Sequence, residues 1–179
     1  MSLSTVFDAA SAWPEANLTD PGDIRARLRD VGVRFERVPA EIELGPDAGQ
    51  DEVLTAYAPL VTMNRDSFGY QTADVIRLRK GTPDTAPMRQ KFLAEHTHSE
   101  DEARMFIEGS GCFYLNIGGK VFRAVMEQGD YISVPAGTRH WFDMGPDPAF
   151  AAIRFFTNQE GWVAQFTGQK IAERFPLYE

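Results

Sequence analysis

The chain has 179 residues, a hydrophobic content of 43% and a formal net charge of −8, which fits one globular domain with a buried core. Its 18 basic residues form no basic block and face 26 acidic ones, so we expect neither nucleic acid nor a membrane surface as a partner. No signal-peptide pattern or membrane span is present in the sequence, and a single cysteine, Cys112, cannot form an internal disulfide; these features predict a cytoplasmic protein.

The first part of the chain, about residues 1–72, is predicted to be a helical elaboration. Residues 20–31 begin with a capping aspartate and a first-turn proline, and carry three apolar residues on one helical face. Residues 49–64 repeat apolar side chains at helical spacing. Pro59 lies within this second stretch and predicts a kink or an early stop of the helix.

From about residue 73 the hydrophobic pattern alternates, which is typical of strands. Two alternating runs are joined by Gly118 and Gly119, a combination that predicts a tight hairpin. Many short strands separated by turns favour a β-sandwich or barrel. We therefore expect a mainly β fold in one domain, 1–179, with a barrel core at about 73–158 and a short helix and tail at about 159–179.

Histidine is rare in this chain, and its placement is the main chemical signal. His96 and His98 are one residue apart, and the third histidine, His140, lies far downstream in PAGTRHWF. If KFLAEHTH is a strand, His96 and His98 project from the same face and can converge on a metal ion. Glu102 and His140 are the natural candidates to complete the site. An isolated His-x-His pair is more often a surface or core feature, so the argument depends on all three histidines falling in one spacing pattern.

Two motifs carry a resemblance to the cupin superfamily. HTHSEDE followed by Gly109 resembles the first cupin motif, and GDYISVPAGTRH resembles the second. The chain departs from these motifs at Gln90, where a glycine is usual, and at Met144, where an asparagine is usual; neither position is a metal ligand. The longer stretches HTHSEDEARMFIEGSGCFYL and GDYISVPAGTRHWFD are similar to the acireductone dioxygenase family of the methionine salvage pathway, with the specific motifs confined to about residues 90–145.

This resemblance implies a cupin (jelly-roll-like) β-barrel that binds one Fe(2+) or Ni(2+) ion per chain through His96, His98, Glu102 and His140. A donor set of imidazole and carboxylate without thiolate also disfavours a structural zinc site. The implied reaction is the cleavage of 1,2-dihydroxy-3-keto-5-methylthiopentene by O2. The iron form would give formate and 4-methylthio-2-oxobutanoate, and the nickel form would give formate, CO and 3-methylthiopropanoate.

Arg104 follows Glu102 by two residues, so the two side chains should share one strand face. A guanidinium fixed in the same cavity could stabilise the substrate dianion, and we assign this catalytic role to Arg104. The alternative is a surface ion pair with one of the neighbouring acids.

Phe92 and Phe142 have the strand parity of the histidines, and they could form an apolar wall of the substrate pocket. Ordinary barrel-core packing is the alternative for both. Trp162 is a candidate for the same pocket, from a lid near the C-terminus.

The remaining charged residues near the motif have no firm role. Solvated charge is the simple interpretation of Glu95, Glu100 and Asp101. Glu95 or Asp101 could instead tune the site from behind the ligands or help to load the metal. Arg154, a charged residue in an apolar strand, could line the cavity, but the sequence offers no partner for it.

Two further functions remain open from the sequence. The chain could be another metal-dependent cupin enzyme, such as an isomerase or an oxidase. It could also be a non-catalytic cupin that binds a small molecule, which would need neither Arg104 nor open positions on the metal. An acidic surface and a closed barrel permit a monomer.

Overall fold

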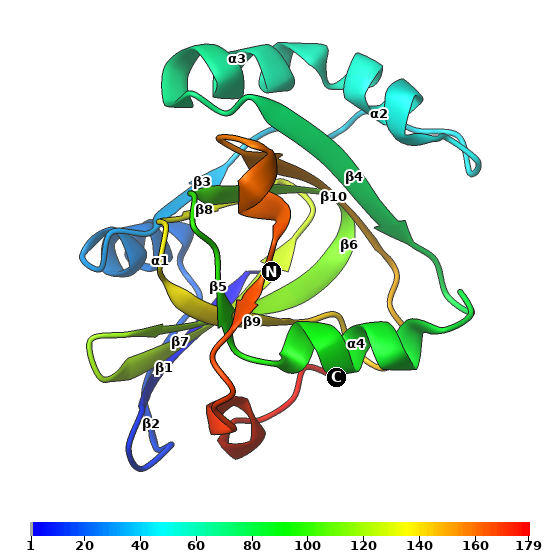
Figure 1. Ribbon diagram of the computed structural model, residues 1–179. Helices are drawn as coiled ribbons and strands as arrows, with labels where there is room; N and C mark the ends of the chain where they lie inside the picture. Colours follow the sequence, from blue (N-terminus) through cyan, green and yellow to red (C-terminus); the bar gives the residue numbers. More distant parts are fainter. Residues whose placement is uncertain (1) are drawn as a thin grey trace.

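The computed structural model describes residues 2–179. Its strands curve into a barrel, and helices flank that barrel (Figure 1). The strands are β1 (Leu3–Asp8), β2 (Pro14–Leu18), β3 (Arg34–Arg37), β4 (Thr72–Leu78), β5 (His96–Thr97), β6 (Glu102–Ile117), β7 (Lys120–Glu127), β8 (Asp130–Val134), β9 (Arg139–Asp143), β10 (Phe150–Phe156) and β11 (Gln165–Phe166). The helices are α1 (Pro21–Arg29), α2 (Gln50–Ala56), α3 (Ala58–Phe68) and α4 (Thr85–Leu93), with single 3-10 turns η1 (Gln159–Trp162) and η2 (Ile171–Arg174). The predicted mainly β, cupin-type barrel is confirmed.

The long strand β6 holds the barrel together because it pairs with four other strands. Its first part pairs with β8 and β10, and its second part pairs with β7 and β9. The change of partners occurs near Gly109, whose φ is +62° and where a Cβ atom would lie 1.9 Å from the carbonyl oxygen of Ala149. Only glycine fits such a close approach of two backbones. The glycine that closes the first motif is therefore a structural requirement of the barrel.

The N-terminal part is only partly helical, which corrects the prediction for residues 1–72. Helices α1, α2 and α3 lie where the sequence predicts helices. The second predicted helix is interrupted at Tyr57, just before Pro59, and so forms the two helices α2 and α3. However, β1, β2 and β3 are strands of the same sheet: β1 pairs with β7, and β3 pairs with β8. Strand pairing across about a hundred residues overrides local propensity here.

The stretch KFLAEHTH is not one strand, which corrects a second expectation. Residues up to Leu93 belong to helix α4, and β5 contains only His96 and Thr97. The predicted C-terminal helix is also different, because it consists of η1 and η2 with the short strand β11 between them. No helix among residues 2–179 is long and apolar enough to cross a membrane.

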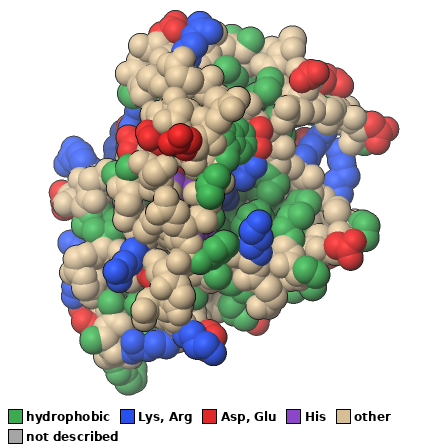
Figure 2. Space-filling view, viewed as in Figure 1, with side chains coloured by type: hydrophobic (Ala, Val, Ile, Leu, Met, Phe, Trp, Pro, Cys, Tyr) green, Lys and Arg blue, Asp and Glu red, His purple; other side chains and the backbone are tan. Residues whose placement is uncertain are grey.

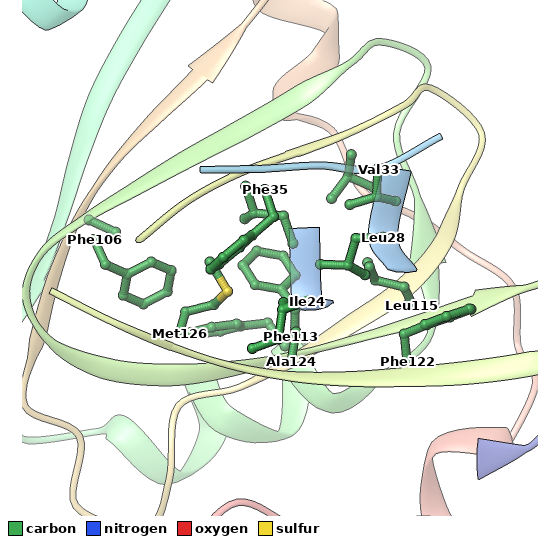
Figure 3. Packing of buried hydrophobic residues seen from close by; sticks show 14 of the residues in the cluster. Ile24, Leu28, Val33, Phe35, Phe106, Phe113, Leu115, Phe122, Ala124 and Met126 are labelled. Carbon is green, nitrogen blue, oxygen red and sulfur yellow. The ribbon is translucent and has the colours of Figure 1, made fainter. Parts of the chain in front are cut away.

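The main hydrophobic core lies between the curved strands, and side chains of α1 pack into it (Figure 3). Ile24 and Leu28 of α1 are 2% and 0% exposed and belong to the same cluster as Phe113 of β6. Each fully buried side chain of this size stabilises the fold by about 1.5–3 kcal/mol. A rigid, fully packed barrel thus fixes the strands that carry the candidate site.

Candidate metal centre

Two adjacent strands bring the three histidines together. His96 of β5 pairs directly with His140 of β9 in the sheet. Their ring centroids are 4.5 Å apart, and the His98 ring lies 5.2 Å from that of His96 and 5.4 Å from that of His140. One ring nitrogen from each residue lies within 4.8 Å of the others, and all three side chains are buried. The sheet register therefore assembles a group of three imidazoles that can hold one metal ion.

Hydrogen bonds fix the tautomers of two of these rings. His96 Nδ1 lies 2.8 Å from the carbonyl oxygen of Ala94, and His140 Nδ1 lies 2.8 Å from that of Thr138. Since a carbonyl only accepts, each Nδ1 donates, and each Nε2 keeps a lone pair for a metal. The backbone on either side of the two short strands thus orients both rings for binding.

Glu102 supplies the carboxylate at the start of β6. Its Oε2 atom is 3.4 Å from His98 Nε2 and 3.3 Å from His140 Nε2. Within residues 2–179, Glu102 Oε2 and His140 Nε2 are buried without a well-aligned hydrogen-bond partner. Buried polar atoms without partners are costly, and a cation between these atoms would satisfy both. This observation fits a metal site.

The protonation states also suit metal binding. Burial, together with the nearby His140, lowers the pKa of His96 to about 4. Burial also lowers the pKa of His98. Burial opposes ionisation of Glu102, but Arg104, His140 and His98 outweigh it and hold the pKa of Glu102 well below its usual value. At neutral pH the site therefore presents His96 and His98 as neutral imidazoles beside a charged Glu102 carboxylate, which are the forms that bind a metal.

Arg104 lies beside this group and not on the surface, so the surface ion-pair alternative is wrong. Its side chain is 4% exposed, and its Nε donates to Glu102 Oε1 at 2.8 Å. Its guanidinium carbon lies 4.8 Å from the ring centroids of both Phe113 and Phe142. Arg104 Nη1 is buried and has no hydrogen-bond partner in the described part of the chain. A donor is therefore available for an anionic oxygen in the cavity.

A cavity of about 280 Å³ opens from the histidines, and the three predicted aromatic residues, Phe92, Phe142 and Trp162, all line it. Histidine surface is visible in Figure 2 only as small patches deep in the face, close to hydrophobic and basic side chains. Phe92 reaches the cavity from α4, so the strand argument for it was wrong although the location is right. Trp162 comes from η1 and is held by a hydrogen bond from Nε1 to Thr72 Oγ1 of 3.1 Å.

Glu95 is not a solvated charge, because it is 1% exposed. Its two carboxylate oxygens accept hydrogen bonds from Asn116 Nδ2 at 2.8 Å and from Thr167 Oγ1 at 2.7 Å. Glu95 thus ties the segment before His96 to β6 and to the chain after β11. Solvent exposure could not be read from the sequence, because burial of Glu95 depends on the distant C-terminal segment that covers it.

Asp101 and Glu100 lie outside the ligand group. Asp101 is exposed and accepts a hydrogen bond from the backbone N–H of Ala136 at 2.8 Å. Glu100 accepts one from Thr157 Oγ1 at 2.5 Å. Both residues therefore fasten the turn between His98 and Glu102 to neighbouring loops.

Sequence reasoning missed five residues that line the cavity: Lys91, Phe156, Val163, Ala164 and Phe166. Phe156 and Phe166 pack edge-on against the His98 and His96 rings at 5.4 and 5.8 Å. Phe156 is the last residue of an apolar strand, and Phe166 lies in a segment without clear hydrophobic periodicity. The sequence therefore contained no signal that separated Phe156 from core residues or Phe166 from loop residues.

The barrel and its buried group of three histidines beside a carboxylate define a metal-binding protein of the cupin class. The family model described as ARD/ARD' matches residues 14–164. The chain belongs to the ARD/ARD' family.

Curated relatives and a solved structure agree with this assignment. An acireductone dioxygenase from Synechococcus sp. (strain ATCC 27144 / PCC 6301 / SAUG 1402/1) is 54% identical over 99% of this chain and 99% of its own length. One from Parasynechococcus marenigrum (strain WH8102) is 54% identical over 94% of this chain and 91% of its length. The structure of the acireductone dioxygenase from Bacillus anthracis with a cadmium ion in its active centre has a TM-score of 0.80 and 27% identity, covering 93% of this chain and 98% of that chain. The chain is a metal-dependent dioxygenase.

Proposed function

We propose that this protein cleaves the acireductone 1,2-dihydroxy-3-keto-5-methylthiopentene with O2, as a step of methionine salvage. The observation that carries the proposal is the pairing of two features in one buried cavity. Among the described residues, Glu102 Oε2 and His140 Nε2 have no well-aligned hydrogen-bond partner, and the Arg104 Nη1 donor has none either. The first two atoms suit a cation, and the third suits an anion, so the cavity is complementary to an anionic ligand that chelates a metal.

We further propose that His96, His98, Glu102 and His140 hold one Fe(2+) or Ni(2+) ion. Three imidazoles and one carboxylate suit these ions, and four protein ligands leave positions open on a six-coordinate metal. When bound, the ion would supply Lewis acidity and a template for the substrate. The iron form is proposed to give formate and 4-methylthio-2-oxobutanoate, and the nickel form to give formate, CO and 3-methylthiopropanoate.

The residues of the chain have separate tasks in this proposal. Arg104 faces the substrate oxygens with a fixed charge and favours the dianion, which is the electron-rich form that reacts with O2. Phe92, Phe142 and Trp162 enclose the methylthio tail and exclude water from the reacting carbons. Glu102 has a second task, because its Oε1 atom holds the Arg104 guanidinium in place.

Oxygen uptake with this acireductone tests the proposal directly. Samples loaded with Fe(2+) alone or Ni(2+) alone should both consume O2, and CO should be released only by the nickel form. A His140→Ala variant provides the matched control, because it keeps the pocket but removes one ligand, and it should lose bound metal and O2 uptake together. A folded, metal-loaded protein that consumes no O2 with either ion would refute the proposal and favour a non-catalytic binding protein.

The place of action is proposed to be the cytoplasm. Cys112, the single cysteine of the chain, is buried and forms no disulfide, as in proteins of reducing compartments. A monomer is the simplest assembly that the proposed reaction needs, because one chain supplies every proposed ligand.

A further inference from the structure

Arg154, for which the sequence offered no partner, lies next to Arg104 in the sheet. The two residues are directly paired between β10 and β6, so their side chains project from the same face. Asp74 of β4 is paired with Arg154 on the other side of β10. Three neighbouring strands thus carry a row of charges that continues from the Arg104–Glu102 pair beside the histidines.

The Arg154 guanidinium is held in a fixed position at the wall of the cavity. Its Nε and Nη2 atoms donate to the two carboxylate oxygens of Asp74 at 2.8 and 2.5 Å. Its carbon atom Cζ lies 5.1 Å from the ring centroid of Trp162. The third nitrogen, Nη1, takes part in neither bond to Asp74. A two-point hydrogen bond and an aromatic contact leave the guanidinium little freedom, so its charge is fixed before any ligand arrives.

Two guanidinium groups, those of Arg104 and Arg154, come from paired positions of β6 and β10 and line the same cavity. Among residues 2–179, the charged side chains that line the cavity are the basic Arg104, Arg154 and Lys91 and one carboxylate, Glu102; Asp74 pairs with Arg154 without lining the cavity. The chain as a whole carries a net charge of −8, so the cavity has the opposite sign to the rest of the molecule. This local inversion of charge indicates a site for an anion.

We propose that Arg154 is a second anion-binding residue of the pocket, which acts with Arg104 to select the substrate as its dianion. This inference rests on the proposed function and adds a residue to it. Arg104 is fixed by Glu102, and Arg154 is fixed by Asp74, so each cation keeps its own carboxylate while both face the ligand. Two guanidinium groups from adjacent strands can each direct N–H donors at a different oxygen of the ligand, which suits a dianion better than one guanidinium alone would.

The test uses the metal-loaded protein under anaerobic conditions, titrated with the acireductone. The ultraviolet absorption of the bound compound distinguishes its monoanion from its dianion. Arg154→Gln should weaken binding by about tenfold, equivalent to ~1.4 kcal/mol, and should lower the fraction bound as dianion. Arg154→Lys should restore most of both effects because it keeps the charge. In aerobic assays, KM should rise for Arg154→Gln.

The matched control is Arg77→Gln. Arg77 of β4 also donates to a carboxylate, that of Glu108 on β6 across the intervening strand β10, with Nε 3.1 Å and Nη2 2.5 Å from the Glu108 oxygens, but it does not line this cavity. The Arg77→Gln variant should leave both the affinity for the acireductone and the spectrum of the bound compound unchanged. The inference is overturned if Arg154→Gln binds the compound with wild-type affinity and spectrum, or if Arg154→Lys behaves like Arg154→Gln. Failure of the proposed function is a separate result, because wild-type protein would then consume no O2.

Discussion

Replacing Arg104 with alanine should separate catalysis from metal binding. Arg104 donates to Glu102 Oε1, whereas the proposed metal ligand atom is Oε2, so the variant keeps the ligand group intact. Removing a positive charge from beside a cation site does not weaken attraction for the metal. The loss of a fixed donor for a developing anion costs about 10²–10³ in rate. We therefore expect kcat/KM to fall by that factor while metal content stays near that of the wild type.

The same variant makes a stability prediction that depends on the metal. Breaking a buried ion pair costs about 3–5 kcal/mol, and for a chain of this size each kcal/mol lowers the melting temperature by roughly 2–4 °C. Without metal, the Glu102 carboxylate of the Arg104→Ala variant is left buried and uncompensated. With metal, the ion compensates it. The melting temperature should therefore fall by roughly 6–20 °C in the metal-free protein and by less in the loaded protein.

The assays are oxygen uptake, metal analysis of the purified protein and thermal unfolding with and without metal. Arg104→Lys serves as a second variant, because it keeps the positive charge but not the planar set of guanidinium donors. Its activity should lie between those of the wild type and Arg104→Ala. Parallel losses of activity and metal content in Arg104→Ala would refute the reasoning. They would mean that Arg104 holds the ligand group together and does not act on the substrate.

Three further predictions concern packing, pH and the buried acid. Gly111→Ala would place a Cβ 2.4 Å from the Phe142 ring; we expect a loss of about 1–3 kcal/mol in unfolding free energy and a higher KM, whereas Gly45→Ala, with open space around it, should change neither. Because burial lowers the pKa of His96 to about 4, its imidazole stays neutral below the ordinary value of about 6.5, so metal content should be kept at about pH 6 and lost only toward about pH 4; dialysis at fixed free metal measures this, and a loss centred near pH 6.5 would contradict it. Glu95→Gln places an amide donor against one of the two existing donors, Asn116 Nδ2 or Thr167 Oγ1. The free energy of unfolding should fall by about 1–3 kcal/mol, and hydrogen exchange at residues 165–167 should become faster. Unchanged exchange there would show that Glu95 does not hold this segment.

Local pattern was enough to predict much of the fold and the centre of the site. Strand parity placed Glu102 and Arg104 on one face of β6, and the Nε–Oε1 hydrogen bond between them confirms that geometry. The hairpin at Gly118 and Gly119 is also where the sequence predicts it, and both glycines have positive φ. These features depend on neighbouring residues, whose side-chain direction follows directly from backbone periodicity.

The errors fall where distant segments decide the outcome. Helix α4 replaces the expected strand before His96, because a short apolar run is compatible with either period. Strands β1 and β3 form because β7 and β8 offer free edges to them. The sequence pattern alone could not identify those partners.

By itself, the sequence predicted His96, His98, Glu102 and His140 as one group, because their spacing follows the two motifs, and the structure places these four side chains together. Only the tertiary structure decided what surrounds them. Register across β4, β10 and β6 placed Asp74 and Arg154 beside Arg104, and the C-terminal segment buried Glu95. The physical reason is that a motif marks residue types at fixed positions along the chain, whereas burial, charge pairing and cavity shape depend on contacts between segments that are far apart in the chain.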